Sequence, residues 1–441
     1  MKKYDNYKES GIEWIGKVPE DWDVIKLKWL TPIKRGASPR PIDDLKYFDE
    51  NGEFSWVRIA DVSASERYLE NTKEKLSELG ASLSVKQYPG DFFLSIAGSV
   101  GKPIITKIKC CIHDGFVWFP ELKINPEYLY YIFQTGLPFI GLGKIGTQLN
   151  LNTETIGNIV IPNLSDDDIK KIVSFLDYKT NLIDDTIKKK KRLIELLKEK
   201  RQAVINEAVT KGLNANAPMK DIGVEWLGEI PEHWNLVPLR YLYKKIGSGV
   251  TPKGGGDVYV DEGVTFIRSQ NVHFDGLRLD DVVKIDNNTH QKMSNSNVEL
   301  NDVLLNITGA SIGRCCVVNI DEEMNVNQHV CIIRVNEKIN PNYLNVVLQS
   351  NVGQIQIKLL TTGGNREGLT HEAVKNMSIP LPDIETQTEL LNTISEKLNT
   401  YDLINTKILF QIDKLQTYRQ SLISEAVTGK IDVRDWSLNK Q

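Results

Sequence analysis

The chain has 441 residues and a nearly balanced charge, with 54 Lys and Arg against 58 Asp and Glu and a formal net charge of −4. The length indicates two to four domains, and the slightly acidic balance excludes a uniformly basic coat, so any DNA binding must rest on local patches. No apolar run is long enough to span a bilayer, the start is polar, and the five Cys have neither disulfide-scaffold nor Cys-x-x-Cys spacing, which predicts a cytoplasmic protein with reduced thiols and no membrane contact.

The chain contains an internal repeat, whose first repeated motif lies near the N-terminus. Residues 11–22 (GIEWIGKVPEDW) return as residues 223–234 (GVEWLGEIPEHW), with seven of the twelve positions identical. Together with the further repeated motifs described below, this repeat indicates two domains of one architecture. We interpret the regularly placed tryptophans as packing anchors.

Segments with a strand-like pattern follow in both halves. Lys and Arg residues lie next to them, in turns that contain Gly and Pro. Lys and Arg in such turns suit phosphate contacts, whereas Arg, Gln and Asn are residue types that pair with base edges in a major groove. Each such residue alone also fits a solvated surface side chain, but their recurrence at equivalent places favours recognition. The candidate DNA-binding residues are Arg35, Ser38, Arg40, Arg58, Lys102, Lys253, Arg268, Gln270, Arg314, Asn365 and Arg366.

Further short motifs superficially resemble the sequence motifs of adenine methyltransferases. Residues 125–128 (NPEY) and 340–343 (NPNY) resemble the Asn/Asp-Pro-Pro-aromatic motif of adenine methyltransferases, and residues 139–143 (FIGLG) resemble the turn that binds S-adenosylmethionine. The second Pro is absent, the order of the motifs is reversed, and the second half lacks the Gly turn. We therefore interpret Asn125 and Asn340 as the starts of short helices. No phosphate-binding loop or nucleophile elbow is present in the sequence.

Each half ends in a long polar segment, at about residues 166–210 and 385–428, in which apolar residues recur by threes, fours and sevens. No Pro or Gly interrupts either segment, which predicts two long helices. Because such a helix cannot bury its apolar stripe alone, we predict that the two pair as a coiled coil; packing of each on its neighbouring domain is the alternative. The predicted pairing residues are Leu176, Ile183, Ile194, Leu197, Ile394, Tyr401, Ile412 and Leu415.

These observations predict an α+β protein made of two similar strand-rich domains, each followed by a long helix. The expected boundaries are 1–163 for the first domain, 164–212 for the first helix, 213–383 for the second domain, 384–430 for the second helix, and 431–441 for a tail. The loop words of the two domains differ, as at residues 146–149 and 363–367. This difference is expected of two domains that recognise different targets.

The doubled words resemble those of the specificity subunit of Type I restriction-modification systems. The words that carry the resemblance are residues 11–22 and 223–234, the two Ile-Asn-Pro-x-Tyr-Leu words, and the two helix ends at 201–210 (RQAVINEAVT) and 419–428 (RQSLISEAVT). The resemblance implies two target recognition domains, each reading one part of a bipartite site in double-stranded DNA, and two helices that pair antiparallel and fix the spacer.

The same resemblance implies that the chain is not itself an enzyme and holds no cofactor. It implies two partner methyltransferase subunits that carry S-adenosylmethionine, and restriction subunits, joined through them, that use ATP and Mg. Two alternative functions remain compatible with the sequence: a self-contained DNA adenine methyltransferase, and a scaffold of a restriction system that binds only protein.

Overall fold

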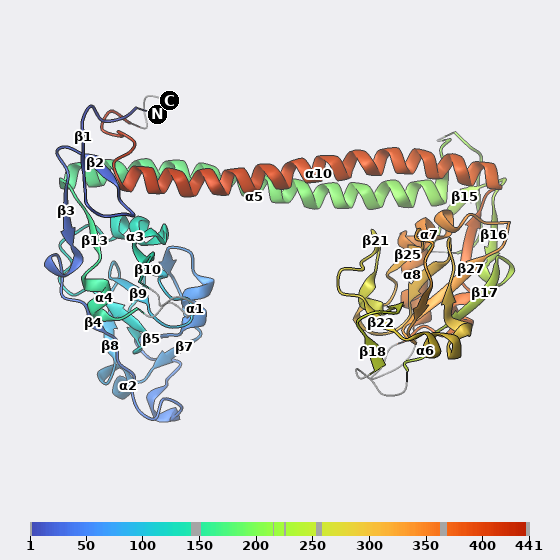
Figure 1. Cartoon of the computed structure of the whole chain (residues 1–441), viewed down its shortest axis with the longest axis horizontal. Helices are drawn as coiled ribbons and strands as arrows, with labels where there is room; N and C mark the ends of the chain where they lie inside the picture. Colours follow the sequence, from blue (N-terminus) through green and yellow to red (C-terminus); the bar gives the residue numbers. More distant parts are fainter. Residues whose placement is uncertain are drawn as a thin grey trace. The chain divides into compact units, whose positions relative to one another are not determined.

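The computed structural model describes residues 2–142, 151–214, 216–224, 226–252, 258–361 and 368–437. Contacts divide the chain into two compact units, Met1–Lys190 with Phe410–Gln441, and Lys191–Leu409. Each unit contains one strand-rich domain and one half of each long helix, α5 (Asp166–Lys211) and α10 (Ile384–Val427) (Figure 1). The two loop words at 146–149 and 363–367 lie outside the described residues.

The first unit is built on two sheets. A five-stranded sheet is ordered β4-β12-β9-β10-β6, with bounds Lys34–Arg35, Phe116–Trp118, Phe92–Ser95, Pro103–Thr106 and Tyr68–Leu69. A four-stranded sheet is ordered β7-β5-β11-β8, with bounds Glu74–Leu76, Phe54–Val57, Cys110–Ile112 and Val85–Gln87. All residues of β9, β10 and β11 are buried, as expected of strands covered on both faces.

Short elements complete the first unit. Two strand pairs are β1 with β2 and β3 with β13, with bounds Tyr7–Glu9, Lys17–Pro19, Asp23–Lys26 and Val160–Asn163. The short helices are α1, α2, α3 and α4, at Ile59–Ala64, Glu78–Ser82, Pro126–Gln134 and Thr153–Gly157, and the 3-10 turns η1, η2 and η3, at Leu27–Trp29, Leu45–Tyr47 and Leu137–Phe139.

The second unit repeats this plan with a different division of strands. Its four-stranded sheet is ordered β17-β27-β24-β25, with bounds Tyr243–Ser248, Val330–Val335, Val303–Asn306 and Cys315–Val317. Its five-stranded sheet is ordered β18-β22-β19-β26-β23, with bounds Tyr259–Val260, Val283–Ile285, Val264–Ile267, Met324–Val326 and Asn297–Val298. In both units, therefore, the strand that precedes the Gly-rich turn, β9 or β24, lies in the interior of its sheet.

The remaining elements of the second unit are short. Three strand pairs are β14 with β15, β16 with β28 and β20 with β21, with bounds Met219–Asp221, Glu229–Pro231, Asn235–Pro238, Ser378–Leu381, Val272–His273 and Gly276–Leu277. The helices are α6, α7, α8 and α9, at Asn287–Lys292, Pro341–Gln349, Asn351–Leu360 and His371–Lys375, and the 3-10 turns η4, η6, η7 and η8, at Leu239–Tyr241, Ser269–Asn271, Ser294–Ser296 and Gly309–Ser311.

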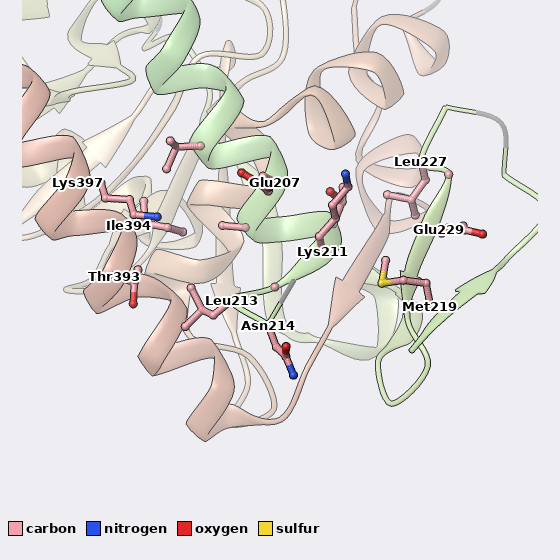
Figure 2. A pocket seen from close by; sticks show the side chains of 15 residues that line it. Glu207, Lys211, Leu213, Asn214, Met219, Leu227, Glu229, Thr393, Ile394 and Lys397 are labelled. Carbon is pink, nitrogen blue, oxygen red and sulfur yellow. The ribbon is translucent and has the colours of Figure 1, made fainter. Parts of the chain in front are cut away.

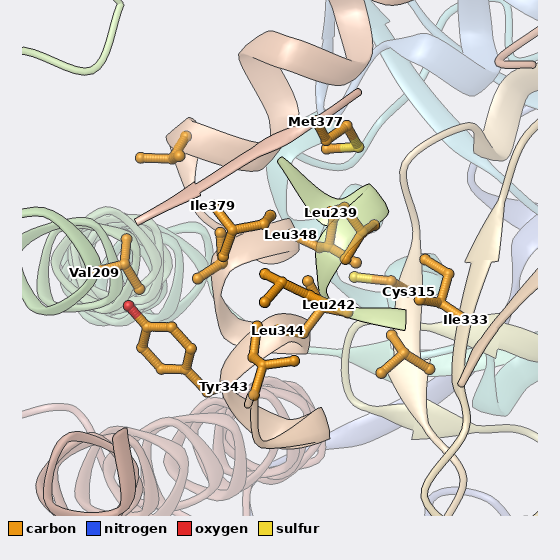
Figure 3. Packing of buried hydrophobic residues seen from close by; sticks show 14 of the residues in the cluster. Val209, Leu239, Leu242, Cys315, Ile333, Tyr343, Leu344, Leu348, Met377 and Ile379 are labelled. Atoms are coloured by element: carbon orange, nitrogen blue, oxygen red, sulfur yellow. The ribbon is translucent and has the colours of Figure 1, made fainter. Parts of the chain in front are cut away.

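A buried tyrosine occupies the same repeat position in the short helix next to the long helices of each unit. In the second unit, Tyr343 and Leu344 of α7 pack with Val209 of α5 in one apolar cluster (Figure 3). The Tyr343 hydroxyl donates to the Pro380 carbonyl at 2.8 Å. In the first unit the corresponding hydroxyl, that of Tyr128, donates to the Val427 carbonyl of α10 at 3.1 Å. Both tyrosines are fully buried, but the Tyr128 hydroxyl bonds to a long helix, whereas the Tyr343 hydroxyl bonds to β28 within its own domain.

The long helices contact each other, which confirms the predicted fold. In the first unit, Arg419 of α10 donates to Asp184 of α5 at 2.9 Å, and Lys190 donates to Gln411 at 2.6 Å. Residue numbers that rise on one helix therefore fall on the other, so the pairing is antiparallel. Of the predicted pairing residues, Leu176, Ile183, Ile194, Ile394 and Ile412 are buried, while Leu197, Tyr401 and Leu415 are half-buried.

Side chains at the helix starts explain where the long helices begin. Asp383 accepts a hydrogen bond from the backbone N–H of Thr386 at 2.8 Å, and Ser165 accepts one from Asp168 at 3.2 Å. Three aspartates in the first turn of α5 add a favourable interaction with the helix dipole. No described helix has both the length and the apolar character required to cross a membrane.

Candidate nucleic-acid interface

In the first unit, the loop that carries the first predicted cations is held against the loop between β11 and β12. The Gly36 N–H donates to the Phe116 carbonyl at 2.9 Å, and the Ala37 N–H donates to the Ile112 carbonyl at 3.2 Å. A Cβ at Gly36 would lie 2.2 Å from the His113 carbonyl oxygen, so only glycine permits this approach. Gly36 is therefore required because the two loops pack closely at this position.

Three predicted recognition residues converge on Asp114 at this contact, one on its backbone carbonyl and two on its carboxylate. Arg35 donates from Nε to the Asp114 carbonyl at 2.5 Å, and Ser38 donates from Oγ to Asp114 Oδ1 at 3.2 Å. Arg40 donates from Nη2 to Asp114 Oδ2, also at 3.2 Å. Because each guanidinium has five N–H donors and both Arg side chains are exposed, most of those donors stay available for phosphate or base acceptors.

Arg58 and Lys102 occupy the same end of the domain but have other partners. Arg58 pairs with Glu74 of β7, and its charge, after burial, is one of the causes that lower the pKa of His113. Lys102 donates from Nζ to the Ser63 and Ser65 carbonyls at 3.0 and 2.5 Å. Burial lowers the pKa of Lys102, and its two carbonyl partners make it a brace of α1 in this unbound chain.

In the second unit, the polar side chain of Asn306 ties two predicted loops together. Its Nδ2 donates to the Ser269 carbonyl at 2.8 Å and to Ser311 Oγ at 3.1 Å. Ser269 lies between Arg268 and Gln270, and Ser311 precedes Arg314 in the Gly-rich turn. The Arg268 guanidinium lies 5.7 Å from the centre of the Tyr259 ring, and Gln270 is exposed. Lys253, Asn365 and Arg366 lie outside the described residues.

Several polar residues at this end of the second unit were not singled out from the sequence. Thr308 hydrogen bonds to His329 Nδ1, and His371 Nε2 lies 3.2 Å from Ser248 Oγ. Asp114 is the corresponding omission in the first unit, where the sequence analysis assigned no role in recognition. Extending the repeat comparison to the residues just before the two strands at 116–118 and 330–335 would have pointed to both loops.

The two methyltransferase-like Asn residues cap helices. Asn125 Oδ1 accepts from the Glu127 N–H at 2.8 Å, and Asn340 Oδ1 accepts from the Asn342 N–H at 2.9 Å. Pro follows each Asn at the first helical position, where it does not cost a hydrogen bond. This geometry confirms the interpretation of the two words as helix starts. Of the Gly turn at 139–143, residue 143 lies outside the described residues.

A pocket of about 590 Å³ lies in the second unit, between the end of α5 and the start of α10 (Figure 2). Lys211, Leu227, Thr393 and Ile394 are among its lining residues, and no predicted recognition residue lines it. Its position is explained by the repeat, because Thr393 corresponds to Phe175 in the first unit, at an offset of 218. There Phe175 packs on Trp436 of the tail, with ring centres 5.5 Å apart. The second half thus has Thr393 at this helix junction where the first half has an aromatic pair.

A family model for the Type I restriction modification DNA specificity domain matches residues 19–196 and 231–414. The chain belongs to this family. It is the DNA specificity subunit of a Type I restriction-modification system, and subunits of this family are non-catalytic and carry no cofactor themselves. The resemblance noted in the sequence is therefore confirmed, and the self-contained methyltransferase is excluded.

Individual relatives agree with the assignment along the chain. The specificity subunit of the Type I restriction enzyme MjaVIII from Methanocaldococcus jannaschii is 24% identical over 443 residues, covering 98% of this chain and 97% of that protein. The EcoBI specificity subunit of Escherichia coli is also 24% identical, over 355 residues, covering 78% of this chain and 74% of the relative.

Two solved structures share the fold of the specificity subunit. A chain from a structure of a type I R-M system, described for its complex assembly and conformational transition, has a TM-score of 0.72 at 15% identity, covering 94% of this chain and 99% of that one. The HsdS subunit from Thermoanaerobacter tengcongensis has a TM-score of 0.51 at 14% identity, covering 94% of this chain and 98% of that one.

Proposed function

We propose that each domain of this specificity subunit reads one half of a bipartite DNA site. The observation that carries the proposal is that each unit gathers Arg and polar side chains on loops at one end of its sheets. In the first unit these surround Asp114, and in the second they surround Asn306. The two loop sets differ in residue type, which suits two different half-sites, because direct readout depends on the donors and acceptors that each loop presents.

The paired helices act as the spacer between the half-sites. A helix of 46 residues is about 69 Å long at 1.5 Å per residue, which corresponds to about two turns of a DNA duplex. The buried seam on both helices, with Ile183 and Ile194 on α5 and Ile408 on α10, supports a rigid pair. A rigid pair selects one gap between the half-sites, since other gaps require bending or twisting of the DNA.

The outer faces of the same helices dock two methyltransferase subunits, and restriction subunits join through them. In the first unit, Leu182, Phe410 and Tyr418 are exposed on the helices; in the second unit, Leu193 and Leu403 are among the exposed apolar residues. Large apolar side chains that are not used by the seam favour a protein contact. The methyltransferase subunits supply S-adenosylmethionine and methylate adenine, and the restriction subunits use ATP and Mg.

Methylation mapping of genomic DNA tests the proposal directly. Cells that express the chain with its cognate methyltransferase partner are compared with cells that express the partner alone. We expect a split motif with a fixed gap, methylated on both strands, only when the chain is present. Methylation at an undivided site contradicts the bipartite reading. Absence of methylation despite co-purification with the partner favours the protein-only scaffold.

A further inference from the structure

One half-buried charge cluster in the first unit has no part in the contacts described above. Arg67 immediately precedes β6, and its side chain is only 15% exposed. It donates from Nη1 to Asp177 Oδ1 of α5 at 2.5 Å and forms an ion pair with Glu127 of α3. One guanidinium thus connects a strand of the recognition domain, its short helix and the long helix.

Aromatic rings enclose this guanidinium, and two tyrosine hydroxyls donate hydrogen bonds to its carboxylate partners. The rings of Tyr68, Tyr130 and Tyr131 lie 4.8 to 5.2 Å from Arg67. The Tyr131 hydroxyl donates to Asp177 Oδ1 at 2.6 Å. The Tyr68 hydroxyl donates to Glu127 Oε1 at 2.9 Å. Both carboxylates therefore have a neutral donor in addition to the cation, which makes the cluster a directed network.

The second unit has no counterpart at the equivalent positions. The Asn-Pro words align Glu127 with Asn342, and the offset of 218 aligns Asp177 with Ser395. Tyr131 corresponds to Val346, and Thr180 corresponds to Leu398. Both Val346 and Leu398 pack against the apolar cluster of the second unit. At these positions the first domain is attached to α5 by directed ionic bonds, whereas the second has no charged side chain there. Elsewhere the second domain also uses hydrogen bonds to α5, as from the Asn351 N–H to Asn206 Oδ1 at 2.8 Å.

The network is close in the chain to the loops that face DNA in the proposed function. Arg58 and α1 belong to those loops, and Arg67 follows α1 by three residues. Ser63 of α1 lies 2.6 Å from Ser99 of the Gly-rich turn, hydroxyl to hydroxyl. Lys102 braces the Ser63 and Ser65 carbonyls, as described above. A change in the direction in which Arg67 meets α5 therefore moves α1 together with the turn.

We propose that Arg67 is a positioning residue that fixes the orientation of the first recognition domain on α5 and thereby the gap between half-sites that the subunit accepts. The inference rests on the proposed bipartite function. A half-buried ion network of this kind contributes little net stability compared with apolar packing, but it defines geometry because its hydrogen bonds are directional. A small rotation at Arg67 changes where the first domain meets the duplex without altering its base contacts.

The test measures DNA binding by the complex of the full chain with its methyltransferase partner. The DNA probes carry both half-sites from methylation mapping and the cognate gap, or a gap one base pair shorter or longer. Two variants are compared with the unmodified chain: Arg67→Lys, which keeps the charge but lacks the planar fork, and the neutral triple variant Arg67→Met, Glu127→Gln, Asp177→Asn. The triple variant leaves no half-buried carboxylate without its cation, so we expect it to fold even if a single neutralisation does not.

We expect the preference for the cognate gap over the altered gaps to fall about tenfold in the triple variant, with a smaller fall in Arg67→Lys. Arg278→Met is the matched control, because Arg278 pairs with Asp275 on the surface of the second unit, with both side chains more than half exposed. This control should keep the preference. An equal loss of affinity for all three gaps, or an unchanged preference, overturns the role of Arg67.

The two proposals fail in different ways. If the unmodified complex binds all three gaps equally, the spacer function itself is wrong and the role of Arg67 falls with it. If the unmodified complex prefers one gap and the triple variant keeps that preference, only the inference about Arg67 is wrong. Thermal unfolding of each variant, measured beside the binding, separates a lost preference from a lost fold.

Discussion

Asp114 places a negative charge in the middle of the proposed DNA-binding loops of the first unit. A carboxylate at that place repels a phosphate, but it also holds Ser38 and Arg40, while the Asp114 backbone carbonyl holds Arg35, so the three side chains share one arrangement before DNA arrives. The ion pair of Arg40 is largely exposed, with 78% of its side chain accessible, so it adds little to stability. The role of Asp114 is therefore to order the loop.

Replacing Arg40 with Ala should weaken binding to the cognate site and to unrelated DNA by similar factors, since we place this side chain among the phosphate contacts. The slope of log K against log salt concentration should fall by about one. Fluorescence anisotropy at several salt concentrations measures both quantities. Lys8→Ala is the control, because Lys8 forms a comparable exposed pair with Asp23 outside the loops. An unchanged slope in Arg40→Ala removes Arg40 from the phosphate contacts.

His113 gives the first domain a predictable dependence on pH. Burial lowers the pKa of His113 below its usual value, although Asp114 opposes that shift. Its Nδ1 accepts a hydrogen bond from the Gly115 N–H at 2.8 Å, which protonation of Nδ1 abolishes. Because the folded pKa is depressed, the stabilisation is present above the unfolded pKa of about 6.5 and is lost as the pH falls through the folded pKa.

We therefore expect binding that depends on the first half-site to weaken as the pH falls from neutral to mildly acidic values. His113→Asn offers an amide oxygen near the position of Nδ1 and does not titrate, so its binding should change less over the same range. Anisotropy titrations at each pH, with probes mutated in one half-site at a time, measure the effect. Parallel pH curves for the two proteins contradict this assignment.

The buried seam dominates at the scale of the helices. Ile194 is 9% exposed and Ile408 is 5% exposed, whereas Leu193, next to Ile194, is 44% exposed. Replacing either buried isoleucine with Ala should cost about 2 kcal/mol or more, because it removes packed methylene groups. Leu193→Ala should change the stability by less than about 0.5 kcal/mol. Thermal unfolding measures the difference, and equal losses from Ile194→Ala and Leu193→Ala would contradict the observed seam.

The same helices show what a sequence can predict. The expected ranges of 166–210 and 385–428 agree closely with Asp166–Lys211 and Ile384–Val427, because a regular apolar period over this length has few alternative structures. The order of strands could not be predicted. For example, β5 and β11 pair in parallel, with Ser55 beside Cys110, and local patterns contain no information about such distant partners.

Single residues with distant partners were also beyond the sequence. Arg67 meets Asp177, which is 110 residues later, and neither lies in a repeated word. Asp114 was visible, but its role depends on the approach of the loop at Arg35, 79 residues earlier. The repeat shows which positions of the two halves correspond to each other. It gives no information about contacts that only one half makes, and the network at Arg67 is such a contact.

At the scale of the whole chain, the repeat leads us to expect that the two domains are separable in function. The pair formed by β3 and β13 closes the first domain, with Asp23 beside Asn163, so a junction after residue 163 leaves this pair intact. At the other end, the Asp432 N–H donates to the Lys2 carbonyl at 2.9 Å. Because that contact uses the backbone of Lys2, a replacement N-terminal segment can reproduce it.

Exchanging residues 1–163 for the equivalent domain of a relative should therefore change one half of the methylated motif and keep the other half. The gap should be retained when the incoming domain supplies an arginine that meets Asp177, and it should broaden when that arginine is absent. Methylation mapping of cells that express the chimaera and the partner methyltransferase measures both properties. A chimaera that receives its own domain through the same junctions controls for the cloning. A change in both half-sites would mean that the domains do not read DNA independently, and a retained gap without the arginine would assign gap selection to the helices alone.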